Sequence, residues 1–196
     1  RDTRHALEVY SNVEKLLDSE DHPELCEARI RMAAAYLEMG ELDRAREHAI
    51  QAFEETEDND SDISHARAMA ILGRYYARVN ENELAMQYYS GALDILSDQT
   101  DPHSAVEVSM LLGQVLNDAG RKEEASEQYI DALVLAEAND FRMLQGEILA
   151  RLGEVESDRS QKMDYLQRSL SVFRELGAVD RMREVQNSVH RAVMGH

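Results

Sequence analysis

The chain has 196 residues, of which 43% are hydrophobic and 31% are charged, enough for one sizeable domain or a short repeat array and too apolar for a long disordered chain. The formal net charge of −18 opposes a broad attraction to nucleic acid or to an anionic membrane, because the long-range field has the wrong sign. A single cysteine, Cys26, excludes an internal disulfide, and no apolar stretch approaches the roughly 20 residues of a membrane span, so we expect a cytoplasmic protein.

A period of 40 residues organises the chain. Three Leu-Gly pairs, which begin at Leu72, Leu112 and Leu152, are each 40 residues apart, and alanines recur at the same step. Within each period the apolar residues recur at spacings of three and four, which predicts two amphipathic helices per repeat. The sequence therefore predicts an all-α chain of repeated helix pairs.

The expected elements follow in chain order within a single domain over 1–196. We expect a partial repeat or capping helix over 1–20 and repeats over 24–61, 64–99 and 102–138. A degenerate fourth repeat covers 141–176, and a capping helix covers 180–193. The second helix of the fourth repeat, near Tyr165 to Phe173, fits the period only if the preceding turn is about three residues shorter.

Small residues stand at the places where a helix pair must turn or cross closely. Gly40, Asn80 and Gly120 suit the left-handed position that ends a helix, since glycine and then asparagine tolerate it best. Gly73 and Gly113 are expected where two helices cross, with tyrosines filling the neighbouring holes. Each repeat is thus predicted to be a tight helix–turn–helix whose core forms by stacking on the next.

These residues resemble the tetratricopeptide repeat. The second repeat carries the family pattern most fully, in Leu72, Gly73, Tyr76, Asn80, Ala85, Tyr89 and Ala92. The resemblance implies a right-handed α-α superhelix, a solenoid whose first helices line a concave groove that binds peptides or proteins. The 40-residue unit exceeds the usual 34 and is similar to the longer units of Rap-type and MalT-like bacterial regulators and of kinesin light chains.

Three arginines are the main groove candidates that the resemblance implies. Arg67, Arg74 and Arg78 fall on one face of the first helix of repeat two. They either anchor a carboxylate, a C-terminus or a phosphorylated side chain, or tie the repeats together, and the sequence leaves both interpretations open. In the second interpretation Arg67 and Arg78 pair with acids on adjacent helices, namely Glu27, Glu38, Glu107 and Asp118.

Other groove positions carry amide and apolar side chains. Gln114 and Asn117 are candidates to pair with the main chain of an extended peptide, with simple solvation as the alternative. Met110, Ile30 and Leu37 are candidates for an apolar pocket, with core packing as the alternative. In the fourth repeat the same positions hold Glu147, Ala150 and Glu154.

No motif predicts catalysis or a metal site. Asp58, Asp60 and Asp62 alternate as at the start of a calcium loop, but Ile63 stands where glycine is needed, so we expect a solvated acidic loop. The histidines have no metal-ligand spacing on one helix. We therefore expect a protein that is not an enzyme and holds no cofactor or metal.

The sequence favours a peptide- or protein-binding module, the ligand- or partner-sensing part of a larger regulatory or scaffold protein. The expected partner is a protein or peptide segment, acidic or bound by its C-terminus, with no direct binding of nucleic acid or membrane. The alternative is self-association, as a homo-oligomer or within a multiprotein complex. A further alternative is a Rap-like regulator that acts on a response-regulator partner.

Overall fold

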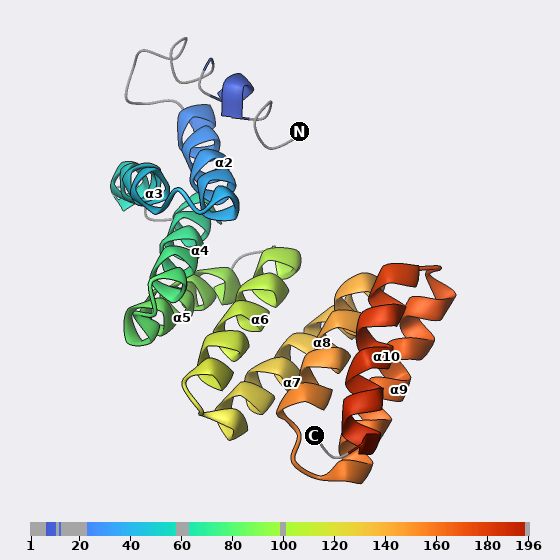
Figure 1. Cartoon of the computed structure of the whole chain (residues 1–196). Helices are drawn as coiled ribbons and strands as arrows, with labels where there is room; N and C mark the ends of the chain where they lie inside the picture. Colours follow the sequence, from blue (N-terminus) through green and yellow to red (C-terminus); the bar gives the residue numbers. More distant parts are fainter. Residues whose placement is uncertain (1–6, 11, 13–22, 58–62, 99–100, 195–196) are drawn as a thin grey trace. The chain divides into compact units, whose positions relative to one another are not determined.

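The computed structural model describes residues 7–10, 12, 23–57, 63–98 and 101–194, and this part of the chain is all-helical with no strand. Residues 7–10 and 12 are helical, and the rest of the predicted 1–20 segment lies outside the described residues, as do Asp58, Asp60 and Asp62. The helices are α2 (Pro23–Met39), α3 (Leu42–Glu57), α4 (Ile63–Arg78), α5 (Asn82–Asp98), α6 (Pro102–Asp118), α7 (Lys122–Ala138), α8 (Arg142–Val155), α9 (Arg159–Glu175) and α10 (Val179–Met194) (Figure 1).

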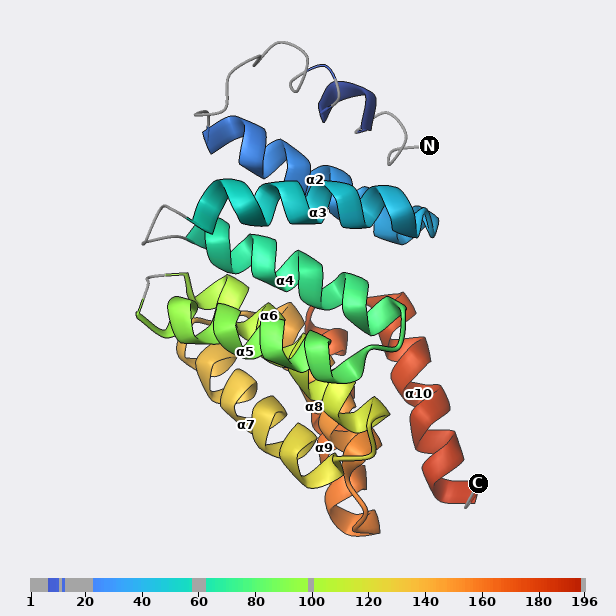
Figure 2. The ribbon, with the colours of Figure 1, turned by 90° about the vertical axis from the view of Figure 1, so that its left-hand side faces the viewer.

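The chain divides into two compact units, which are described separately. The N-terminal unit, Arg1–Thr100, contains α2 to α5, and the C-terminal unit, Asp101–His196, contains α6 to α10. Each predicted repeat range corresponds to one helix pair, and the range 180–193 to α10, within one residue at the helix ends. In the N-terminal unit α2 and α3 pack side by side, and α4 packs on both of them (Figure 2).

The turns within the first three pairs are built alike. Gly40, Asn80 and Gly120 have φ angles of 76°, 62° and 80°, which lie in the left-handed region that glycine and asparagine tolerate. In each turn the amide of the next residue donates back across the end of the first helix. The amides of Glu41, Glu81 and Arg121 donate to the carbonyl oxygens of Tyr36, Tyr76 and Leu116, at 2.9, 2.9 and 2.8 Å.

The fourth pair turns by another device. Glu156 is extended, with φ −65° and ψ 130°, and no left-handed residue is needed. The side chain of Asp158 then caps α9 by accepting a hydrogen bond from the amide of Gln161 at 2.9 Å. Three residues, 156–158, link the two helices, as many as in the second and third pairs.

Two glycines allow a tyrosine of the partner helix to lie against the backbone. A Cβ added at Gly73 would lie 2.6 Å from Cε1 of Tyr89, and one at Gly113 would lie 2.5 Å from Cε1 of Tyr129. Both tyrosine side chains are about 1% exposed. The predicted packing role of the Leu-Gly pairs is confirmed at these crossings.

The fourth repeat makes the same crossing with a different residue. A Cβ added at Gly153 would lie 2.7 Å from Leu166. Leu166 follows Gly153 by 13 residues, whereas Tyr129 follows Gly113 by 16, so α9 enters the crossing three residues early. The three-residue shift predicted for this repeat is confirmed, but its location in the turn is corrected, because α8 has 14 residues against 17 in α6 while the two turns are equally long.

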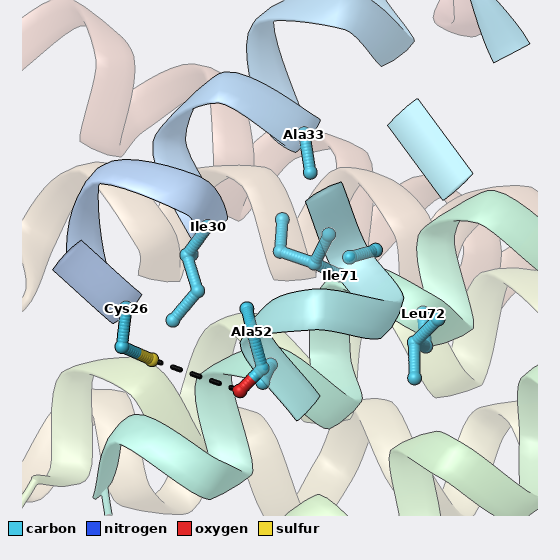
Figure 3. Packing of buried hydrophobic residues seen from close by; sticks show 8 residues of the cluster. Cys26, Ile30, Ala33, Ala52, Ile71 and Leu72 are labelled. Atoms are coloured by element: carbon cyan, nitrogen blue, oxygen red, sulfur yellow. Dashed lines mark hydrogen bonds between the residues drawn. The ribbon is translucent and has the colours of Figure 1, made fainter. Parts of the chain in front are cut away.

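Buried apolar side chains join the helices within each unit. In the N-terminal unit a cluster of α2, α3 and α4 residues includes Ala33, Ala52 and Ile71 (Figure 3). The thiol of Cys26, 5% exposed, donates to the carbonyl oxygen of Ala52 at 3.7 Å across this cluster. Removal of this apolar surface from water is the main force that holds such stacks together.

Candidate functional site

The arginine row of α4 lies on the surface of the N-terminal unit. Arg67 and Arg78 are exposed and Arg74 is half-buried. Nη1 of Arg67 lies 3.7 Å from Oε2 of Glu27 on α2, so this arginine ties two neighbouring first helices together. Among the described residues of the N-terminal unit, no carboxylate lies within 4 Å of Arg74 or Arg78. Arg67 therefore has the repeat-joining role, and the anchoring role stays a prediction for the row.

Two of the predicted groove residues are buried instead. Ile30 is 7% exposed and Leu37 is 3% exposed, and Ile30 belongs to the core cluster with Ala33 and Ala49. The prediction that these two side chains line an open apolar pocket is therefore corrected. Large aliphatic side chains gain more from burial than the alanines that hold the same positions in α4.

The three candidate groove residues of α6 are partly accessible on the C-terminal unit. Met110, Gln114 and Asn117 are half-buried. Gln114 is already engaged, because its Oε1 accepts a hydrogen bond from Arg151 on α8 at 2.5 Å and its Nε2 donates to Asp118 at 2.8 Å. Gln114 therefore joins the first helices of repeats three and four.

The last helix occupies the place of a further first helix, which the sequence analysis missed. When the three-residue shortening is included, Val185 of α10 aligns with Ile148 of α8 and Val108 of α6, and all three are at most 4% exposed. The same alignment puts Arg191 at the groove position held by Glu154 and Gln114. Subtracting the three missing residues from the 40-residue step, which gives 37, would have revealed this register.

An open cleft of about 420 Å³ lies between α8 and α10. Its lining includes three residues that were predicted to face the groove, namely Glu147, Ala150 and Glu154. The rest of the lining is Arg151, Phe173, Arg181, Glu184, Val185, Asn187, Ser188 and Arg191.

A smaller hollow of about 280 Å³ shares three residues with this cleft, namely Glu154, Ser188 and Arg191. It extends toward α9, and its remaining lining residues are Gly153, Lys162, Leu166 and Ala192.

Ion pairs fix most of the charges around the cleft. Arg181 pairs with Glu147 at 2.9 Å and with Glu184 at 3.0 Å, and Arg151 pairs with Glu154 at 3.5 Å. The hydrogen bond to Glu184 and the charge of Glu147 raise the pKa of the Arg181 guanidinium above its ordinary value. The cleft thus presents charged side chains that ion pairs between and within its helices hold in place.

Two tyrosines, Tyr129 and Tyr89, are buried near the charged side chains of the first helices. Burial raises the pKa of Tyr129 to about 12, while the charge of Arg151 opposes that rise and the charge of Glu154 adds to it. Burial also raises the pKa of Tyr89, against the opposing charge of Arg74. Both phenols therefore stay neutral at physiological pH.

The described residues contain neither a candidate metal site nor a candidate membrane-spanning helix. No three or more His, Cys, Asp or Glu side chains gather in a geometry suited to a metal ion. No helix in this part of the chain combines the length and the apolar character needed to cross a bilayer.

The family model described as "Tetratricopeptide repeat" matches residues 30–105 and 110–170 of this chain. Among curated proteins, the human protein O-mannosyl-transferase TMTC1 is 33% identical over 91 residues, which are 46% of this chain and 10% of that protein.

Several solved structures have the same fold. A Rap protein in complex with Competence and Sporulation Factor has a TM-score of 0.82 at 16% identity, over 94% of this chain and 53% of that one. A STAND protein with a tetratricopeptide repeat sensor, from Pyrococcus horikoshii, has a TM-score of 0.75 at 19% identity, over 85% and 26%. BtubC from P. vanneervenii has a TM-score of 0.70 at 15% identity, over 98% and 87%. The chain spans a tenth of the curated relative and about half or less of the first two structures.

Proposed function

Because this chain belongs to the tetratricopeptide repeat family, we propose that it is a non-catalytic module that binds a peptide or protein segment on the faces formed by its first helices. We further propose that the repeat ranges form one domain and that this domain is the partner-sensing part of a larger regulatory or scaffold protein. The partner segment is acidic or presents its C-terminus, and the setting is cytoplasmic.

One observation carries the proposal. The first helices bury one face in the core and present polar side chains from the same repeat positions on the other, and in the C-terminal unit this face is hollowed into the cleft of about 420 Å³. Open clefts with a few fixed polar groups are the usual form of a binding site.

The arginine row supports an acidic or C-terminal partner. No described residue of the N-terminal unit offers a carboxylate to Arg74 or Arg78, and guanidinium groups bind carboxylates with two parallel hydrogen bonds. In the C-terminal unit, Met110 and Asn117 are half-buried and offer an apolar and an amide contact beside Gln114. These residues form the proposed binding set.

Two structural neighbours make a sensing role reasonable. The Rap protein was solved with a bound factor, and the STAND protein carries its repeats as a sensor. The fold is shared with this chain, and the proposal extends the type of role by analogy alone.

A random peptide library displayed on phage tests the proposal. We expect enrichment of acidic or C-terminal motifs on the wild-type chain and its loss on an Arg74→Gln, Arg78→Gln variant. A matched variant with Arg44→Gln and Arg46→Gln, on the second helix α3, should keep the enrichment. No enrichment on the wild type, or equal enrichment on both variants when both keep the wild-type melting curve, would refute the arginine anchor.

Self-association is the second candidate function. The last helix, α10, exposes Val179 by 63% and Met194 by 61%, and apolar side chains of this kind favour contacts between chains. Light scattering over a dilution series tests it. A mass that stays monomeric at the highest concentration would count against this candidate.

A further inference from the structure

We propose that the hollow formed by Gly153, Lys162, Leu166, Ser188, Arg191 and Ala192 is a subsite for the carboxylate of an acidic side chain in the bound peptide, held by Arg191 and Lys162. This inference rests on the proposed peptide-binding function and names where an acidic residue of the partner is placed.

The charges around the hollow are not balanced. Among the described residues, Arg181 has two carboxylate partners and Arg151 has one, whereas no carboxylate is recorded within 4 Å of Arg191 or of Lys162. In the part of the chain that the structure describes, the Arg191 guanidinium donates to the hydroxyl oxygen of Ser188, at 3.0 Å. A carboxylate between these two cations would gain charge-assisted hydrogen bonds that the protein itself does not supply.

The one acid in the wall of the hollow does not cancel this charge. Glu154 already faces Arg151, with 3.5 Å between Oε2 and Nη1. Counting the lining residues Lys162 and Arg191 against Glu154 leaves one excess positive charge in a strongly acidic chain. An incoming anion is therefore favoured locally, although the protein as a whole repels it.

The space suits a side chain that branches from a peptide. The small residues Ser188 and Ala192 line the hollow of about 280 Å³, which shares three lining residues with the cleft of about 420 Å³ and so lies beside it. The larger cleft takes the peptide main chain, beside the exposed amide of Asn187. The smaller hollow takes the acidic side chain.

Nuclear magnetic resonance on the full 15N-labelled chain tests the subsite. The probes are two pentapeptides with blocked ends, acetyl-Ala-Ala-Glu-Ala-Ala-amide and its central Gln counterpart, with a free-ended Ala pentapeptide as the C-terminal carboxylate arm. We expect the Glu peptide to shift the amide signals of Gly153 and Ser188 and the Nε–Hε signal of Arg191. We expect binding about tenfold tighter than that of the Gln peptide, the factor typical of one charge-assisted contact.

Variants separate the subsite from general electrostatics. Arg191→Gln should abolish the preference for Glu over Gln, and Lys162→Gln should reduce it. Arg183→Gln removes the same charge from the same helix but lies outside the cleft, with its side chain 71% exposed, and should keep the preference. Arg191 is exposed, so the variant is expected to fold, and its circular dichroism spectrum checks this.

The outcomes also separate this inference from the proposed function. Equal binding of the Glu and Gln peptides, an unchanged preference in Arg191→Gln, or stronger binding of the free-ended peptide would overturn the subsite. If library-selected peptides still bind the first-helix faces, the proposed function survives. If no peptide binds at any concentration, both fail.

Discussion

The crossing between Gly113 and Tyr129 provides a quantitative test of how these repeats are held together. The change is Gly113→Ala, a single methyl group in the middle of α6. By helix propensity alone it should stabilise the chain by about 1 kcal/mol, because alanine is a better helix former than glycine. The structure predicts the opposite sign.

The magnitude follows from the space available to the new methyl group. Its carbon would lie 2.5 Å from Cε1 of Tyr129 and 2.9 Å from Cδ1 and Cζ, well inside the 3.5–4.0 Å at which carbon atoms attract. The ring is 1% exposed and rigid, so it has no free volume to enter. Overpacking of this kind costs about 2–3 kcal/mol, the upper part of the usual range, and subtracting the propensity gain leaves a net loss of about 1–2 kcal/mol.

Chemical denaturation followed by circular dichroism at 222 nm measures this loss as a change in the free energy of unfolding. The matched control is Gly91→Ala on α5, whose new methyl group meets only the flexible end of Met69. That variant should be unchanged or stabilised by up to about 1 kcal/mol. In a Tyr129→Ala background, Gly113→Ala should no longer destabilise, because the clash is gone. Loss of stability in Gly91→Ala together with none in Gly113→Ala would refute the reasoning.

Three further predictions concern single groups. Ser169→Ala should lower the free energy of unfolding by about 1 kcal/mol, because the buried hydroxyl donates to the carbonyl oxygen of Gly146 at 2.7 Å. Ser171→Ala, on the exposed face of the same helix, should leave this free energy unchanged. Urea titration of the two variants measures the difference. Stability should fall as pH rises from 10 toward 12, because the unfolded phenol of Tyr129 releases its proton near 10 and the folded one near 12. The contribution of Tyr129 to this loss should reach about 2–3 kcal/mol at most. Tyr129→Phe should remove that contribution, which chemical denaturation of both proteins at several pH values measures. Gly120→Ala should lower the free energy of unfolding by about 1 kcal/mol, because residue 120 has a left-handed backbone with φ 80°. A new methyl group there would meet no other atom within 4 Å, so the loss comes from the backbone alone. A melting temperature equal to that of the wild type would contradict this.

The helix pairs and their turns were predictable because their causes are local. Gly40, Asn80 and Gly120 each require a left-handed backbone within one turn of the chain, and the Leu-Gly register repeats at a fixed step. These signals do not depend on what lies far away in the sequence. The three-residue shortening in repeat four was visible for the same reason.

The groove residues were harder to predict because exposure depends on packing. Ile30 and Leu37 share the register of half-buried Ala70 and Ala77, yet both are buried. A periodic pattern gives the direction of a side chain, while its size and its neighbours decide whether it stays accessible. Arg191 was missed for a related reason, since α10 is in register only after the three residues that α8 lacks are subtracted from the 40-residue step.

The early end of α8 in the fourth repeat also indicates where this chain tolerates a change in length. The helix has 14 residues against 17 in α6, yet Leu166 still reaches the backbone at Gly153. The packing of two helices is thus decided by the residues at their crossing. The segment that links them only has to be long enough to connect their ends. For protein engineering, segment 156–158 is therefore the favoured place to insert a reporter peptide, while an insertion inside either helix would move every crossing contact beyond it.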